Sequence, residues 1–568
     1  MRHLILLATL FSPSYFRLHN GYGNRVQYDE LSDQANTLYT PYGVIRGSET
    51  SVRGVPIRQY FGIPYARPPV KKLRFQKPRP LPWRKSRVIL ATRMGPSCPQ
   101  TPYYFDDTRN NRHMRFSEDC LYLNVWTAQL APLRPVVVFL HGGFFTHGGS
   151  ESPNLDMSHL AARGVVAVSF NYRLNAMGFL YAGVPQASGN MGLYDQQLAL
   201  QWIRKHIHYF GGDPARMTVM GHGAGATAAA YHLLNPTSRK IFKRMILLSG
   251  NPFSIMNLNM PNVASTRAST IAKRLGCSRD GNMKSESFEI FHCIASKDAN
   301  EIAKAAELEF TRGELSLMPL FTSEDFLKKS PEQLVYESSK MDDVEILMGH
   351  ANNEYADSLY YTGYFDAADK ILPGDIKYLI GMFYGMFFRA NALPIIRYYF
   401  RNDRTANASS LLRTGGRAIS DGLLVCPGLE YADEMSRLGA KVYYYSFDHS
   451  SAFSKAQFGA TSSEEVLYFL GSILGPLGTQ LGASRKDRQF AEDMLDVVTT
   501  FVYYGRAYSA KMDTEWPTYT AKAPYAASLD NNMALKYGTR EEECNFWAYF
   551  WNDHENATLR NYTHVVIG

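Results

Sequence analysis

The residues with the clearest chemical implication are Gly221 and Gly225, which follow a short apolar run and precede an alanine-rich stretch. Two glycines at this spacing allow a strand to turn sharply into a helix, because a side chain at either position would clash. In the G-x-S-x-G pattern the middle residue of such a turn is a serine, whose hydroxyl attacks an acyl carbon. Here the middle residue is Gly223. The sequence therefore predicts the turn without the nucleophile that it normally presents.

Strands and helices that alternate along the chain must position this turn. Short apolar runs predict buried strands at residues 135–140, 165–171, 217–220 and 245–249, and helical periodicity or alanine content predicts helices at 195–207 and 226–234. This alternation is typical of a parallel sheet that is covered by helices on both faces. No internal boundary, repeat or low-complexity linker interrupts it, so we expect one large α/β domain.

Ordered matches along nearly the whole chain resemble the type-B carboxylesterase and cholinesterase family. Besides the turn, they are FGIPYA at 61–66, SEDCLYLNVW at 117–126, NYR at 171–173, GNMGL at 189–193 and DQ at 195–196. The resemblance implies an α/β-hydrolase fold, with a large, mostly parallel central sheet flanked by helices, over residues 38–550. Serine-esterase catalysis on that fold needs a nucleophile, a histidine base, an acid and donors for the oxyanion.

The resemblance also assigns the three catalytic positions, and two of them hold the wrong residue. Gly223 replaces the serine, and Ser462 falls on the histidine position when the segment is counted between His449 and Gly471. Glu354 occupies the acid position, but a carboxylate without its histidine orients nothing. Losing either the nucleophile or the base from a serine-protease triad costs about a millionfold in rate, roughly 8 kcal/mol. We therefore expect a vestigial triad and an inactive serine-esterase homologue, with His449 in a structural role.

Two further features of the implied site depart from an active cholinesterase. The backbone amides of Gly142, Gly143 and Ala224 are the expected remnant of the oxyanion hole. Phe144 stands where the family has a small residue, and it would crowd that hole. The cholinesterases also carry a tryptophan, between the first two cysteines, that receives a quaternary ammonium group by cation–π contact. This loop contains tyrosine, phenylalanine and several basic residues but no tryptophan.

Several features indicate the oxidising secretory pathway. The chain has six cysteines, and the resemblance pairs Cys98 with Cys120, Cys277 with Cys293, and Cys426 with Cys544. Three N-x-S/T acceptors for glycosylation occur at Asn407, Asn556 and Asn561. Residues 1–18 read as a signal peptide, with a basic start and a short apolar run, and residues 551–568 form a polar tail. We expect no transmembrane span, because no run of about twenty apolar residues occurs.

These expectations lead to a secreted, non-catalytic, cholinesterase-like protein that acts through protein–protein recognition or adhesion, similar to neuroligins and glutactin. Its partner would be an extracellular protein, and a homodimer is one option for its assembly. We expect no cofactor, no metal ion and no nucleic acid, and the net charge of +8 fits weak affinity for acidic glycans, membranes or polyanions. Two alternatives stay open: a carrier that sequesters esters or lipids in the former active-site gorge, and a carboxylesterase with relocated catalytic groups.

Overall fold

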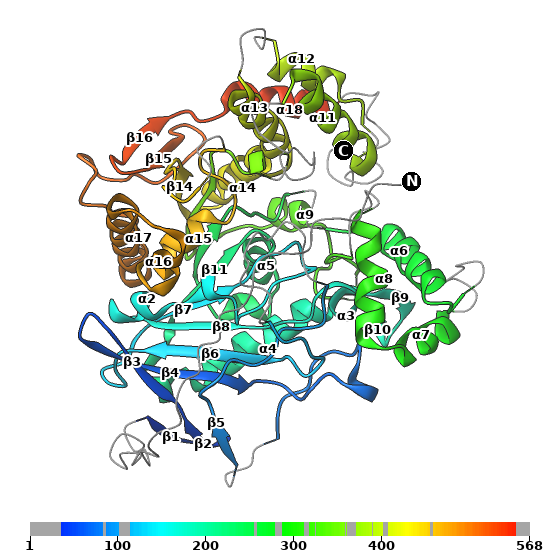
Figure 1. The fold of residues 1–568 in the computed structure, drawn as a ribbon, viewed down its shortest axis with the longest axis vertical. Helices are drawn as coiled ribbons and strands as arrows, with labels where there is room; N and C mark the ends of the chain where they lie inside the picture. The colour runs from blue at the N-terminus through cyan, green and yellow to red at the C-terminus, as the bar shows by residue number, and fades with distance from the viewer. Residues whose placement is uncertain are drawn as a thin grey trace, which may run out of the picture.

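A large mixed sheet crosses the molecule (Figure 1). The computed structural model describes residues 36–552, apart from 83–86, 102–113, 255–257, 279–286, 312–316, 324, 358, 360–370, 389, 402–406 and 455–457. The sheet has 11 strands in the order β16-β15-β14-β13-β12-β11-β7-β8-β6-β4-β3. The α/β-hydrolase architecture that the sequence predicted is confirmed.

The centre of the sheet is parallel and its two edges are antiparallel. The parallel strands are β7 (Arg134–Leu140), β8 (Val166–Phe170), β11 (Gly212–His222), β12 (Arg244–Leu248), β13 (Glu345–Ala351), β14 (Lys441–Phe447) and β15 (Tyr525–Leu529). The antiparallel strands are β3 (Ser48–Val52), β4 (Val55–Pro64), β6 (Tyr122–Thr127) and β16 (Ala534–Tyr537). The strands that the sequence predicted, at 135–140, 165–171, 217–220 and 245–249, all lie in the parallel centre.

Two apolar cores, one on each face, explain why these central strands are apolar throughout. In β7, Val136 and Val138 belong to one core, whereas Val137 and Phe139 belong to the other. Helices α4 (Met191–His206) and α5 (Ala224–Leu234) cover the first face, and α15 (Glu464–Phe469) and α17 (Arg485–Tyr504) cover the second. Because successive side chains of a strand point to opposite faces, both sets must be apolar.

A third apolar core fills a helical region at the top of Figure 1. Its helices are α11 (Pro373–Phe388), α12 (Leu393–Tyr399), α13 (Ala408–Ser420) and α18 (Glu541–Asn552). Trp547 of α18 is fully buried and stacks on Tyr384 of α11, with ring centroids 5.5 Å apart. The C-terminal helix is thereby fixed to segments that lie far earlier in the chain.

The remaining elements are shorter or lie at the periphery. They comprise β1 (Thr37–Thr40), β2 (Gly43–Arg46) and β5 (Val88–Leu90) in a 3-stranded sheet, and β9 (Tyr181–Val184) with β10 (Ala187–Ser188). The helices are α2 (Ser158–Ala162), α3 (Asn175–Phe179), α6 (Pro261–Arg274), α7 (Ser287–Ser296), α8 (Ala299–Thr311), α9 (Pro331–Tyr336), α14 (Cys426–Arg437) and α16 (Pro476–Leu481). None of the helices within the described ranges combines the length and apolar character needed to cross a bilayer.

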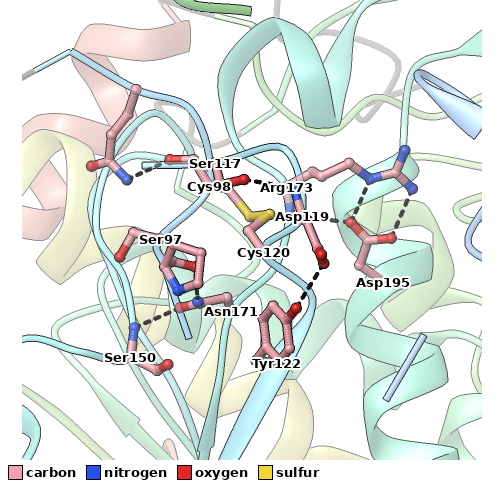
Figure 2. Close-up of a disulfide and its surroundings, with 12 residues drawn as sticks. Ser97, Cys98, Ser117, Asp119, Cys120, Tyr122, Ser150, Asn171, Arg173 and Asp195 are labelled. Carbon is pink, nitrogen blue, oxygen red and sulfur yellow. Dashed lines mark hydrogen bonds and ion pairs between the residues drawn. A yellow bond between two sulfur atoms is a disulfide. The ribbon is translucent and has the colours of Figure 1, made fainter. Parts of the chain in front are cut away.

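All six cysteines form disulfides, in the pairing that the resemblance implied. The bonds are Cys98–Cys120, Cys277–Cys293 and Cys426–Cys544. Figure 2 shows the first of them beside a buried ion pair between Arg173 and Asp195, whose Nε–Oδ2 distance is 2.7 Å. This ion pair joins the segment after β8 to helix α4, close to the sheet's central strands.

Some of the predicted features lie outside the described residues. These are the signal peptide at residues 1–18, most of the tail, and two glycosylation acceptors, Asn556 and Asn561. The third acceptor, Asn407, is exposed at the start of α13. Its side-chain oxygen accepts a hydrogen bond of 2.8 Å from the amide of Ser410. The amide nitrogen of its side chain is the atom that a glycan would modify.

Candidate functional site

The turn that the sequence singled out joins β11 to α5, with Gly223 at its apex. A Cβ on Gly221 would collide with the backbone of Gly225, and a Cβ on Gly225 would collide with the carbonyl oxygen of Leu140. Both flanking glycines are therefore needed because backbone approaches backbone too closely for any side chain. This is the steric requirement of a nucleophile elbow.

The apex itself has different surroundings. A Cβ on Gly223 would meet only one neighbour, the carbonyl oxygen of Ser249, at 4.0 Å. Its backbone has φ 53° and ψ −118°, a conformation that costs a residue with a side chain about 1–3 kcal/mol. Packing would thus admit a serine at this position, and only the backbone conformation opposes it. Lack of space therefore does not account for the glycine at this position.

The loop that carries the expected oxyanion donors lies against this turn. A Cβ on Gly142 would stand 2.6 Å from the carbonyl oxygen of His222, so the loop and the residue before the apex are in direct contact. The next two residues, Gly143 and Phe144, have φ 107° and 52°. Phe144 therefore holds a backbone conformation that favours glycine, and its partly buried ring packs against the helical core. The family's small residue would adopt this conformation with less strain.

Two histidines beside this loop were given no role by the sequence. The ring of His222 packs over Gly142, and its Nε2 is buried without a hydrogen-bond partner among the described residues. The ring of His141 stacks on Tyr172, with centroids 4.4 Å apart, and its Nδ1 lies 2.9 Å from the carbonyl oxygen of Gly142. Burial lowers the pKa of each imidazole to about 4, so both are neutral at pH 7.

The predicted acid, Glu354, follows β13 and is 1% exposed. Its carboxylate accepts hydrogen bonds from the amide of Ala351, at 2.7 Å, and from the hydroxyl of Ser249. The side chain of Ser462 lowers the pKa of the same carboxylate, and the amide of Ser462 donates to the carbonyl oxygen of Glu354 at 3.3 Å. Ser462, predicted to hold the histidine position, therefore lies directly beside the predicted acid.

A second carboxyl group, Glu465 of α15, completes this cluster. The hydroxyl of Ser249 also contacts Glu465, and Tyr445 donates to it at 2.8 Å. A hydroxyl has one proton to donate, so it satisfies two carboxyl groups at once only when one of them is protonated. Burial raises the pKa of both glutamates, and the charge of Glu354 raises that of Glu465 further. We refer to Glu354, Ser249 and Glu465 as the carboxyl cluster.

Sequence patterns did not indicate the carboxyl cluster beyond Glu354. Glu464 and Glu465 lie in the segment counted between His449 and Gly471, and neither was given a role. The available signal was two consecutive glutamates directly before an apolar helix, and only Glu465 is fully buried at the sheet. Ser249 gave no signal of its own, because a serine at the end of an apolar strand is common.

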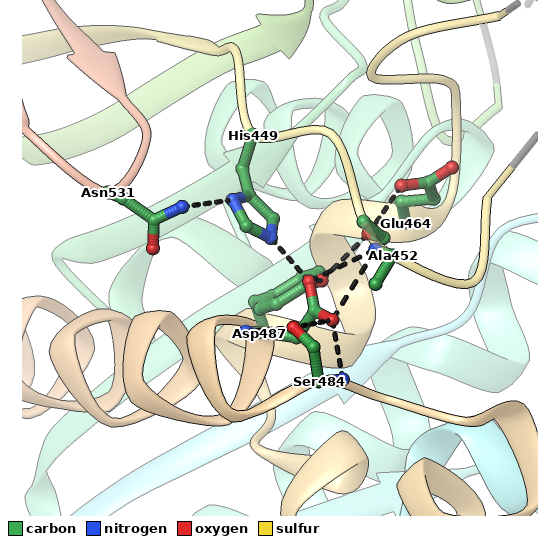
Figure 3. Close-up of polar contacts among 8 residues, drawn as sticks. His449, Ala452, Glu464, Ser484, Asp487 and Asn531 are labelled. Atoms are coloured by element: carbon green, nitrogen blue, oxygen red, sulfur yellow. Dashed lines mark hydrogen bonds and ion pairs between the residues drawn. The ribbon is translucent and has the colours of Figure 1, made fainter. Parts of the chain in front are cut away.

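His449 belongs to a different network, shown in Figure 3. Its Nε2 lies 2.8 Å from Asp487, its Nδ1 lies 3.3 Å from the side-chain amide of Asn531, and its ring stacks on Phe490 of α17. The two contacts assign the proton to Nε2, which donates to the carboxylate, while Nδ1 accepts. Nε2 thus joins the end of β14 to α17, and Nδ1 joins it to the turn after β15, which fits a structural role for this histidine.

Two remaining expectations concern the loop of the cholinesterase tryptophan and metal binding. The loop in which the tryptophan of cholinesterases was sought lies between Cys98 and Cys120, and its residues 102–113 lie outside the described part of the chain. In the part that is described, no three histidine, cysteine or acidic side chains are grouped so that they could hold a metal ion.

A mixed sheet with a glycine-flanked elbow after β11 and a buried acid after β13 defines an α/β-hydrolase. The chain belongs to the carboxylesterase family, whose model matches residues 34–547. It is 31% identical to a cholinesterase of Mus musculus over 534 residues, which cover 90% of this chain and 86% of that protein. It is 30% identical to an acetylcholinesterase of Bungarus fasciatus over 541 residues, which cover 91% of this chain and 87% of that protein.

Proposed function

We propose that this chain is a non-hydrolytic member of the carboxylesterase family that acts outside the cell by binding other proteins. One observation carries the proposal: the apex of its nucleophile elbow is Gly223, which has space for a side chain but no side chain. Acyl transfer by this fold begins with attack by that side chain. Without it, the elbow and the oxyanion loop can bind a carbonyl group but cannot form a covalent intermediate.

The surroundings of the acid support the same proposal. In a catalytic triad the acid accepts a hydrogen bond from the imidazole that serves as base. Here the residue beside Glu354 is Ser462, whose side chain has no basic nitrogen. Ser249, whose carbonyl oxygen is the neighbour of a Cβ placed on Gly223, has its hydroxyl held between two buried carboxyl groups. It is therefore a poor substitute for the missing nucleophile.

The expected loss of rate acceleration is large enough to remove hydrolysis as a function and not only to slow it. Serine proteases without a nucleophile or base retain only about 10³–10⁴-fold acceleration over water, from oxyanion donors and substrate binding. What is retained is the scaffold: three disulfides and the buried ion pair of Arg173 with Asp195. Disulfides persist in oxidising compartments, which supports an extracellular site of action. A stable folded scaffold that no longer hydrolyses esters can still present a surface that another protein recognises.

Ester hydrolysis and active-site labelling test the proposal. We expect the purified chain to hydrolyse p-nitrophenyl esters at the background rate and to take up no organophosphate label. Gly223→Ser should behave in the same way, because it restores a hydroxyl but no base. Turnover by the unmodified chain, accompanied by stoichiometric labelling, would overturn the proposal.

A double variant tests the assignment of the histidine position. Gly223→Ser/Ser462→His places an imidazole beside Glu354, and we expect turnover and labelling above those of Gly223→Ser alone. The matched control is Gly223→Ser/Ser463→His, in which the imidazole is one residue further along the chain and exposed. The placement of the base at residue 462 would be contradicted if the two double variants were equally active, or if neither were active above background.

Binding is tested with the same proteins. Affinity capture from extracellular extracts should retrieve the same partner with the unmodified chain and with Gly223→Ser, because recognition does not use the elbow. Failure to retrieve a partner from any native source would count against the binding function while leaving the loss of hydrolysis intact.

A further inference from the structure

One stretch of the chain has an extreme charge composition that the proposed function does not use. Between Glu49 and Asp106 there is no acidic residue, whereas lysine and arginine together number 12. The charge of this stretch therefore exceeds the net charge of +8 of the entire chain. Runs of one sign are unusual inside a folded domain, because like charges repel unless an oppositely charged partner balances them.

The central part of the stretch forms a closed loop after β4. Ala66 and Pro80 form a β-bridge, and the amide of Arg67 donates to the carbonyl oxygen of Arg79 at 2.8 Å. A short 3₁₀ helix, Lys71–Leu73, lies between these ends. Five of the loop's cations are exposed, and four of them, Arg67, Lys71, Lys72 and Arg79, make no ion pair with an acidic side chain among the described residues; the fifth is Lys77.

Two other cations of the loop, Arg74 and Lys77, anchor it to the body of the protein. Arg74 forms a bidentate pair with Glu118, and its guanidinium also donates to the carbonyl oxygens of Ala295 and Lys297. Lys77 lies 4.0 Å above the ring of Tyr194. These contacts fix the loop against the body of the protein, so its exposed cations are held in place before any ligand arrives.

Two further exposed cations extend the surface along the neighbouring strand. Arg87 precedes β5 and Arg93 follows it. The backbone of this segment pairs first with β2, through Arg87, and then with β4, where the amide of Phe61 donates to Ala91. β4 leads directly into the loop, and the carbonyl oxygen of Arg93 lies against Gly62 of β4, so this segment runs beside the strand from which the loop begins. Both β4 and β5 are drawn in blue in Figure 1.

We refer to these six exposed residues as the basic band. They are Arg67, Lys71, Lys72, Arg79, Arg87 and Arg93. Within the described residues none of the six is ion-paired with an acidic side chain. Their charges are therefore available to a ligand from solution.

We propose that the basic band binds a sulfated polysaccharide of the extracellular matrix or cell surface. Such a chain is a linear polyanion that can contact several exposed cations at once, and guanidinium groups bind tetrahedral oxyanions through paired hydrogen bonds. The disulfides place the protein in an oxidising compartment, away from intracellular nucleic acid. Anionic lipids are concentrated in the cytoplasmic leaflet, so a membrane is the less suitable polyanion outside the cell. This binding does not depend on the loss of hydrolysis.

Heparin binding by the full chain at 0.15 M salt tests the proposal. We expect the logarithm of the binding constant to fall linearly with the logarithm of salt concentration, as for other polyanions. Lys71→Glu/Lys72→Glu should weaken binding about tenfold or more, since each cation near an anionic surface contributes substantially. The matched control is Arg485→Glu/Lys486→Glu at the start of α17, which changes two adjacent exposed cations and the same net charge. Its affinity should stay within about twofold of the unmodified chain.

A second variant separates binding from folding. Arg67→Ser/Arg79→Ser removes charge from the two ends of the same loop and should weaken heparin binding without changing the thermal midpoint of unfolding. The proposal is overturned if the control variant loses as much affinity as the loop variants, or if no binding occurs at 0.15 M salt. It is equally overturned if desulfated heparin binds as well as heparin, or if phosphatidylserine vesicles or duplex DNA bind more tightly.

Discussion

At the scale of single residues, the three glycines of the elbow have different reasons to be glycine. Gly221 and Gly225 face backbone atoms at distances that no Cβ can occupy. Gly223 faces open space, and its conformation alone disfavours a side chain. The flanking glycines are thus required for the fold. At the apex, a residue with a side chain would have a strained backbone conformation, which active members of the family tolerate because it presents the nucleophile.

Alanine substitutions measure this difference. Gly223→Ala should lower the free energy of unfolding by about 1–2 kcal/mol, because it adds strain at positive φ without a clash. Gly221→Ala should cost about 3 kcal/mol or more, because its Cβ would displace the backbone of Gly225. Denaturant unfolding of the two variants gives both values. Equal losses would show that the apex is as tightly packed as its flanks.

At the scale of elements, the carboxyl cluster joins the ends of β12 and β13 to the start of α15. Burial in this cluster holds the pKa of Glu354 and Glu465 above the ordinary value of 4.5. The folded state therefore retains protons that the unfolded state releases once the pH exceeds 4.5. By linkage, this contribution to stability is present at or below pH 4.5 and is lost as the pH rises towards 8.

Glu465→Gln should reduce the loss of stability that accompanies the rise in pH. The variant has no second carboxyl group to ionise, so its stability relative to the unmodified chain should increase between pH 5 and pH 8. Thermal unfolding across this range measures the change, with Glu301→Gln, an exposed residue of α8, as the control. A pH profile that runs parallel to that of the unmodified chain would contradict the shared-proton description of the cluster.

The ion pair in Figure 2 fixes another junction between elements, that of β8 with α4. Arg173→Met leaves the buried carboxylate of Asp195 without its partner and should cost about 3–5 kcal/mol of unfolding free energy. The double variant Arg173→Met/Asp195→Leu removes both charges and should cost less than the single change. Denaturant unfolding compares the two. A double variant less stable than the single would mean that the pair itself stabilises the fold.

At the scale of the whole molecule, the disulfides restrain loops of very different length. Cys426–Cys544 spans 118 residues and ties α18 to α14, whereas Cys277–Cys293 spans 16. In the chain-entropy description, removing the long link with two serines should cost about 4–5 kcal/mol and removing the short one about 3 kcal/mol. Unfolding under non-reducing conditions measures both. If removing Cys277–Cys293 lowered the free energy of unfolding more than removing Cys426–Cys544, local packing and not chain entropy would account for the stabilisation.

Much of the central fold could be predicted from local sequence. The parallel strands β7, β8, β11 and β12 were predicted because they are continuous apolar runs, buried on both faces, whereas β13, β14 and β15 were not predicted. The antiparallel edges were not predicted, since strands such as β3 (Ser48–Val52) are mostly exposed and carry no apolar run. The helical core around α11 and α18 also escaped prediction, because its contacts join segments far apart in the chain.

The sequence by itself determined the elbow, the glycine at its apex, the family and, through that family, the cysteine pairing. These features depend on neighbouring residues or on ordered matches along the chain. Only the tertiary structure placed Ser249 between Glu354 and Glu465, which lie 105 and 216 residues away from it. Only the structure showed that Gly223 has room for a side chain and that the six cations of the basic band are exposed. Burial, shared protons and open space are properties of atoms brought together by folding, and no local pattern encodes them.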